Sequence, residues 1–171
     1  MTNSFDLQKF MDKVKQVESG HKMDLSSGED LSIAIMNLIS IEEHMFFTSQ
    51  KLGDTKYIEV LNTAREMRKE LMKKIVKENQ GEVWCTSKHL LSGSMRLMEV
   101  GTKCLTKGDQ KEANDYFKKS FDLYNLFWGL NLGLVKSDPQ KTKFEDKPLA
   151  KKDFLGSISK TIGKILDCCR E

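Results

Sequence analysis

The sequence predicts an all-α protein, an up-down antiparallel helical bundle with four central helices and a further helix at each end. Three observations predict this fold. Apolar residues recur at helical spacing almost throughout the 171 residues, and no segment shows a convincing alternation of period two. The breaks between the central helices are short and rich in Gly, Asp and Asn, which favours antiparallel neighbours. Both prolines lie in one polar stretch, KSDPQKTKFEDKP, where a helix must stop.

Two helices are expected before residue 53. The first runs from about residue 4 to 17, and the loop SGHKMDLSSGED follows it. The second runs from about 28 to 52, with Ser26 or Ser27 as its N-cap and two acidic residues in its first turn. Because this second helix is apolar nearly all round, we expect it at the centre of the bundle.

Three more helices are expected at about residues 54–79, 82–107 and 109–132, separated by the turns ENQGE and KGDQ. The last two contain an ordered set of small and apolar residues that resembles the spacing of one tetratricopeptide unit: Leu97, Gly101, Cys104, Gly108, Ala113, Phe117 and Ser120. The sequence has no second copy, and such arrays need several. The spacing therefore predicts a closely packed helix pair and not membership of that family.

The predicted domain organisation has three parts: a helical bundle domain at 1–135, a polar linker at 136–148 and an amphipathic helix at 149–171. The formal net charge of +3 comes entirely from residues 136–171, which hold nine Lys and Arg against six Asp and Glu. This charge is too small to predict nucleic-acid binding. The start lacks a secretory pattern, and the four cysteines have no framework spacing, so we expect a cytoplasmic protein with free thiols.

The second helix carries polar residues along one line of an apolar surface. At about 100° per residue, Asn37, Ser40 and His44 fall together, Glu43 borders them, and Glu42 points away. In the third helix, Arg68 occupies a position on the apolar stripe. A buried charge needs a partner. We therefore predict a buried polar seam in which Glu43 pairs with Arg68, and His44 bonds to Ser40, Asn37 or a backbone carbonyl: Asn37, Ser40, Glu43, His44 and Arg68.

A metal site is the alternative interpretation of the same region. Cys85 and His89 lie one helical turn apart, and a neighbouring helix could add Glu43 and His44 to complete a tetrahedral set suited to zinc or another transition metal. A di-iron carboxylate centre is disfavoured, because no glutamate stands three residues before either histidine. Cys85 activated by His89 would be a covalent nucleophile, but no orienting group can be identified.

The predicted C-terminal helix, 149–171, has one apolar stripe bordered by lysines: Phe154, Leu155, Ile158, Ile162, Ile165, Leu166 and Cys169. Two glycines weaken it as an isolated helix, so we expect it to dock on the bundle. The other interpretations are a dimer contact, a partner's groove and peripheral contact with a membrane surface.

The function favoured by these features is that of a non-catalytic scaffold or protein-interaction module, with a protein partner or a second copy of the chain as its ligand. The alternative is a bundle that binds a metal or a small ligand through Glu43, His44, Cys85 and His89.

Overall fold

The computed structural model describes residues 25–76 and 81–133. These form four helices: α2 (Leu25–Leu52), α3 (Lys56–Ile75), α4 (Gly81–Thr106) and α5 (Gln110–Asn131). The all-α prediction is confirmed, and three of the four central helices end within three residues of their predicted bounds at both ends. The exception is α3, which was expected to continue to residue 79. The predicted N-terminal helix, the linker and the C-terminal helix lie outside the described residues.

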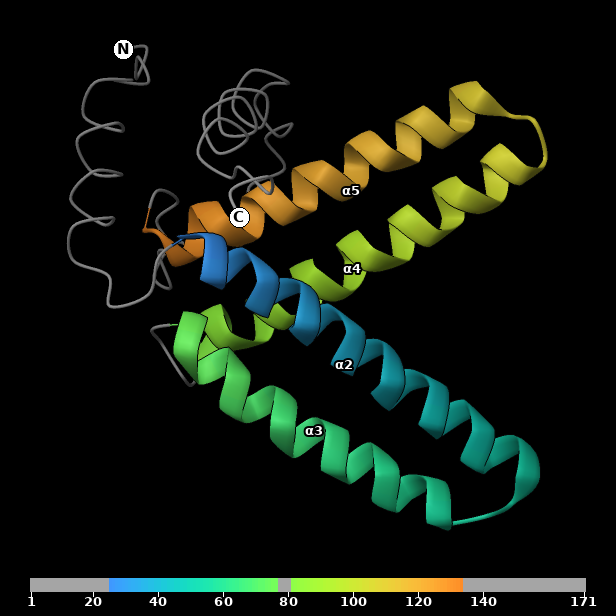
Figure 1. The fold of residues 1–171 in the computed structure, drawn as a ribbon, viewed down its shortest axis with the longest axis vertical. Coiled ribbons are helices and arrows are strands. Elements are labelled where there is room, and N and C mark those ends of the chain that lie inside the picture. Colours follow the sequence, from blue (N-terminus) through green and yellow to red (C-terminus); the bar gives the residue numbers. More distant parts are fainter. Residues whose placement is uncertain (1–24, 77–80, 134–171) are drawn as a thin grey trace, which may run out of the picture.

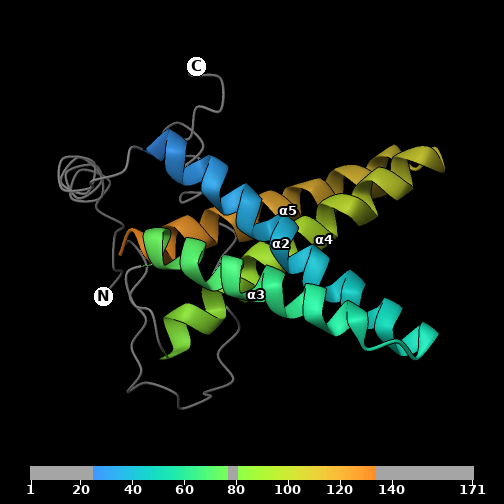
Figure 2. The ribbon, with the colours of Figure 1, turned by 60° about the horizontal axis from the view of Figure 1, so that its bottom comes forward.

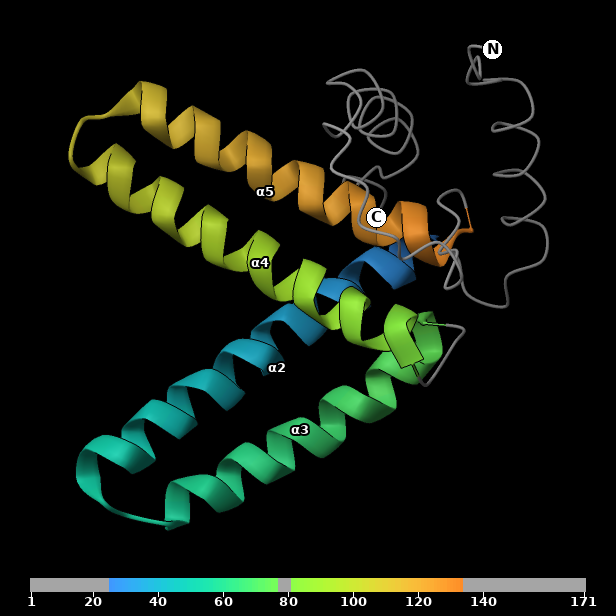
Figure 3. The same cartoon turned by 180° about the vertical axis from the view of Figure 1, so that it is seen from behind.

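The four helices form two antiparallel hairpins, α2 with α3 and α4 with α5. The chain runs up, down, up and down through them, as predicted for the bundle. The hairpins meet at the end where α2 and α4 begin and α3 and α5 finish, and from there they diverge towards their turns (Figures 1 and 3). The divergence is also visible after a rotation of the view (Figure 2). The described part of the molecule is therefore a bundle that is closed at one end and open at the other.

The turn between α4 and α5 follows from its sequence, Lys107–Gly108–Asp109. Gly108 has a φ of 82°, a left-handed conformation in which glycine avoids the strain of a side chain. The side chain of Asp109 then caps α5, because its Oδ1 accepts a hydrogen bond from the backbone N–H of Glu112 at 3.0 Å. These two residues stop one helix and start the next within three positions.

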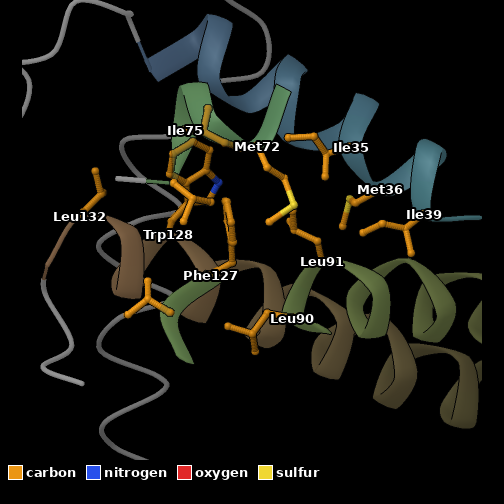
Figure 4. Close-up of a cluster of buried hydrophobic side chains, with 12 residues drawn as sticks. Ile35, Met36, Ile39, Met72, Ile75, Leu90, Leu91, Phe127, Trp128 and Leu132 are labelled. Atoms are coloured by element: carbon orange, nitrogen blue, oxygen red, sulfur yellow. The ribbon is translucent and has the colours of Figure 1, made fainter. Parts of the chain in front are cut away.

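The hydrophobic core lies at the closed end and draws side chains from all four helices (Figure 4). Each helix contributes a large apolar side chain that is wholly inaccessible to solvent: Ile35, Met72, Leu91 and Phe127. Burial of a side chain of this size contributes about 1.5–3 kcal/mol to folding. The core therefore holds the two hairpins together at this end.

Small residues let α4 and α5 pack closely, as their spacing predicts. The hydroxyls of Ser94 and Ser120 are buried, and each donates to the other residue's backbone carbonyl, at 2.9 and 2.7 Å. Two turns further along α4, a Cβ added at Gly101 would lie only 2.6 Å from the ring of Phe117. Glycine at 101 therefore leaves room for the ring of Phe117 against α4.

The prediction that the second helix lies at the centre of the bundle is wrong for its C-terminal half. Ile35 and Met36 are buried, but Phe46 and Phe47, three turns further along the same face of α2, are 46% and 59% exposed. The physical reason is the divergence of the hairpins, since no helix of the α4–α5 hairpin covers this face towards the open end (Figure 1).

Candidate functional site

A cleft of about 760 Å³ lies between the diverging hairpins. Three helices line it: α2 supplies most of one wall, α3 extends that wall, and α4 forms the other. The lining residues are Ser40, Glu42, Glu43, His44, Phe46, Phe47, Leu61, Arg65, Arg96 and Glu99. Aromatic and charged side chains therefore share one concave surface that begins where the core ends.

The apolar part of the cleft is an aromatic pair on α2. The rings of Phe46 and Phe47 lie 5.3 Å apart between centroids and meet edge to face at 67°. Leu61 of α3 adds a half-buried aliphatic side chain to the same lining. Large apolar side chains that stay exposed in a concave surface are typical of sites that bind another molecule.

An ion pair joins the two walls of the cleft. The guanidinium of Arg96 on α4 donates to the carboxylate of Glu43 on α2, and it also donates to Glu99 on its own helix at 2.5 Å. The hydrogen bond to Glu43 raises the pKa of Arg96 above its ordinary value. These side chains are 37–49% exposed, and ion pairs of this kind contribute about 0–1 kcal/mol. The pair is therefore a weak link between the hairpins.

A second ion pair lies deeper and joins α2 to α3. Arg68 is 4% exposed, and its guanidinium forms a bidentate interaction with the carboxylate of Glu42. Nε donates to Oε1, and Nη2 donates to Oε2 at 3.1 Å. The remaining nitrogen, Nη1, contacts the sulfur of Met72 at 3.6 Å. Two parallel bonds between a guanidinium and a carboxylate fix geometry as well as charge. This pair holds the α2–α3 hairpin in register.

The structure changes the predicted polar seam. Arg68 is buried, but it pairs with Glu42, which the helical wheel had pointed away from the seam, and not with Glu43. Asn37 is exposed, and its amide donates to the backbone carbonyl of Ile33 at 3.1 Å. Ser40 is half-buried and His44 is exposed, and both line the cleft. The predicted seam and the observed contacts differ because the face of α2 that bears Asn37 and His44 is directed towards solvent and not towards α3.

The structure does not bring the predicted metal ligands together. Cys85 and His89 are exposed on α4 and are not among the residues that line the cleft, whereas Glu43 and His44 are. Within 25–76 and 81–133, no three His, Cys, Asp or Glu side chains are placed to hold a metal ion. The hypothesis of a zinc or other transition-metal site then rests on spacing alone. Elemental analysis of protein purified without an affinity tag would test it.

Sequence reasoning missed three of the residues that shape the cleft most: Glu42, Phe46 and Phe47. A signal for the two aromatic residues was present. Phe46 and Phe47 stand eleven residues, or about three turns, after the core residues Ile35 and Met36. That spacing placed them on the core-facing side of α2, but only the divergence of the hairpins exposes them.

No protein-family model, curated protein or solved structure matches this chain. Among the helices that the structure describes, none combines the length and the apolar character needed to cross a bilayer.

Proposed function

We propose that this chain is a non-catalytic protein-interaction module, and that the cleft between its hairpins receives a helix of a protein partner. The exposure of Phe46 and Phe47 on the wall of the cleft carries the proposal. Aromatic side chains dominate the binding energy of many protein interfaces, because they bury a large apolar area and lose little rotamer freedom.

The charged groups of the cleft support a binding role. Glu42 and Glu43 each pair with a guanidinium on another helix, and Glu99 pairs with one on its own helix, so their charges are already used within the protein. The buried pair of Glu42 and Arg68 holds α2 against α3, so the two aromatic rings project from a hairpin of defined geometry and less conformational entropy is lost on binding. A cytoplasmic location belongs to the same proposal. Self-association and membrane contact through residues 149–171 stay predictions.

The test compares an exposed apolar residue in the lining of the cleft, Phe47, with one outside it, Met67. A photo-crosslinking amino acid placed at position 47 in living cells should give a discrete adduct with another protein. The same amino acid at Met67, which is 53% exposed and is not among the residues that line the cleft, should give none. The proposal fails if position 47 gives no adduct, or if both positions give the same one.

Folding must be separated from binding in this test. Phe47→Ser removes a side chain that is mostly exposed, so its free energy of unfolding should stay within about 1 kcal/mol of the original. Loss of the adduct from an adjacent crosslinker at His44 in that variant would then report lost recognition. A large fall in stability would show that Phe47 serves folding.

A further inference from the structure

All the carboxylates that line the cleft are paired with arginines, but one arginine of the lining is not paired with any described carboxylate. Each of its three carboxylates receives a hydrogen bond from a guanidinium: Glu42 from Arg68, and both Glu43 and Glu99 from Arg96. Arg65, which lines the cleft from α3, is exposed and makes no hydrogen bond or ion pair with any described residue. The neighbouring carboxylate on its own helix, Glu66, is held instead by Lys69 at 2.8 Å.

The position of Arg65 joins its charge to the apolar part of the cleft. Arg65 follows Leu61 by one helical turn, so both side chains project from the same side of α3. Leu61, Phe46 and Phe47 line this cleft together with it. A ligand that covers the aromatic pair therefore comes within reach of an unpaired guanidinium, whose planar fork of donors matches a carboxylate.

We propose that the partner of this cleft is an acidic amphipathic helix, whose apolar side chains cover Phe46, Phe47 and Leu61 and whose Asp or Glu pairs with Arg65. This inference rests on the proposed function and names the chemistry of the partner. A basic helix fits less well, because it would bring a cation against Arg65, while Glu43 and Glu99 are already paired with Arg96. A cleft of about 760 Å³ accommodates a few large side chains from one face of a helix.

The test uses two synthetic helical peptides of about fifteen residues with the same Leu and Phe face. One carries only Glu on its polar face and the other only Lys, and fluorescence anisotropy measures the binding of each to the full chain. The Glu peptide should bind at least about tenfold more tightly. Arg65→Glu should remove that preference or reverse it. Equal affinities, or tighter binding of the Lys peptide to the unmodified chain, would overturn the proposal.

A matched variant separates local recognition from general electrostatics. Lys74→Glu makes the same change of charge on α3, nine residues further along and so on the opposite side of the helix. Lys74→Glu should leave the affinity for the Glu peptide within about twofold of the original. If both variants weaken binding equally, Arg65 is not the recognition residue. Circular dichroism and thermal unfolding establish that both variants fold.

Failure of this inference can be distinguished from failure of the proposed function. If Phe47→Ser abolishes binding of both peptides and Arg65→Glu changes neither, the cleft binds helices without reading charge, and only the acidic preference falls. If Phe47→Ser changes nothing, the cleft is not the binding surface and both proposals fall. Crosslinks from His44 to residues 149–171, or to a second copy in a stable dimer, would replace the acidic partner with the chain itself.

Discussion

Two adjacent glutamates in α2 show that the position of a charged residue decides how much its ion pair contributes to the stability of the fold. Glu42 faces α3 and pairs with a buried guanidinium, whereas Glu43 lies about 100° further round the helix and reaches across the cleft to an exposed one. A buried pair is sensitive to the loss of one partner, because the remaining charge stays in a medium that solvates it poorly. An exposed pair is much less sensitive to the loss of one partner, because water replaces the lost contact.

The substitutions Glu42→Gln and Glu43→Gln should therefore differ strongly. Each removes one charge and almost no volume. Glu42→Gln leaves Arg68 buried without a counter-charge and should lower the free energy of unfolding by roughly 3 kcal/mol. Glu43→Gln should lower it by less than about 1 kcal/mol. Urea denaturation measures both. Similar losses in the free energy of unfolding would show that the two ion pairs contribute equally to stability.

A tyrosine at the closed end gives the protein a dependence on alkaline pH. The hydroxyl of Ser32 donates to the backbone carbonyl of Glu29 at 2.6 Å, so Tyr124 is the donor in the 2.7 Å bond between the two hydroxyls. Burial raises the pKa of Tyr124 above its ordinary value near 10. The unfolded chain then loses this proton at a lower pH than the folded chain does. Stability is fully present below pH 10 and falls as the pH rises from there towards the pKa of the folded state.

Replacing Tyr124 with phenylalanine should flatten this decline. Tyr124→Phe should cost about 1 kcal/mol at neutral pH, where the hydrogen bond to Ser32 is lost. Above pH 10 the difference from the original chain should shrink, because the variant has no phenol to ionise. Thermal unfolding at pH 7 to 11 measures the two curves. Parallel curves over the whole range would exclude Tyr124 as the titrating group.

At the scale of helices, the separation between α4 and α5 depends on small residues where the two surfaces meet. Ser87, Ser94 and Gly101 recur every seven residues on α4 and are all buried, as are Ala113 and Ser120 on α5. A seven-residue repeat keeps these positions on one face of each helix over two turns. The hairpin can thus pack its backbones closely, and the larger side chains remain for the core and the cleft.

Gly101→Ala should destabilise the hairpin even though alanine favours a helix. The gain in helix propensity is about 1 kcal/mol, but the new methyl group would overlap the ring of Phe117 and force that ring out of its packed position. We expect a net loss of about 1–2 kcal/mol in chemical denaturation. Asn114→Ala, at an exposed position of α5, is the control and should leave stability equal or slightly higher. A stabilising Gly101→Ala would show that the ring of Phe117 can move aside at little cost.

At the scale of the molecule, the two hairpins are strongly joined at one end and weakly at the other. The core contains side chains from all four helices, while the ion pair between Glu43 and Arg96 bridges the cleft. Because that bridge is exposed, salt and substitution can both weaken it without affecting the core. The width of the cleft should therefore be adjustable at a small energetic cost.

Arg96→Ala should widen the cleft while leaving the hairpins intact. Spin labels on cysteines introduced at Lys51 and Lys107, near the two turns, report the distance between the hairpins once the natural cysteines are replaced by serine. Loss of a link worth up to about 1 kcal/mol should raise the ratio of wide to narrow states by up to about fivefold. The original chain in 1 M salt should shift the same way. Lys119→Ala, which breaks an ion pair within α5, should not.

The sequence by itself determined the helices and their order, because helix formation depends on neighbours within a few residues. Periodicity located α2 to α5, and the Lys107–Gly108–Asp109 turn follows from local chemistry. The position of Arg68 on an apolar stripe also indicated a buried ion pair. What sequence could not supply was its partner, since Glu42 and Glu43 differ only in their direction once α3 has packed against α2.

Only the tertiary structure decided where the core ends and the cleft begins. Phe46 and Phe47 continue the same apolar face as Ile35 and Met36, and nothing local distinguishes the exposed pair from the buried one. The difference is made by the angle between two hairpins, which depends on contacts between residues far apart in the chain. Periodicity identifies the apolar face of a helix, but it does not show whether another helix lies close enough to cover that face.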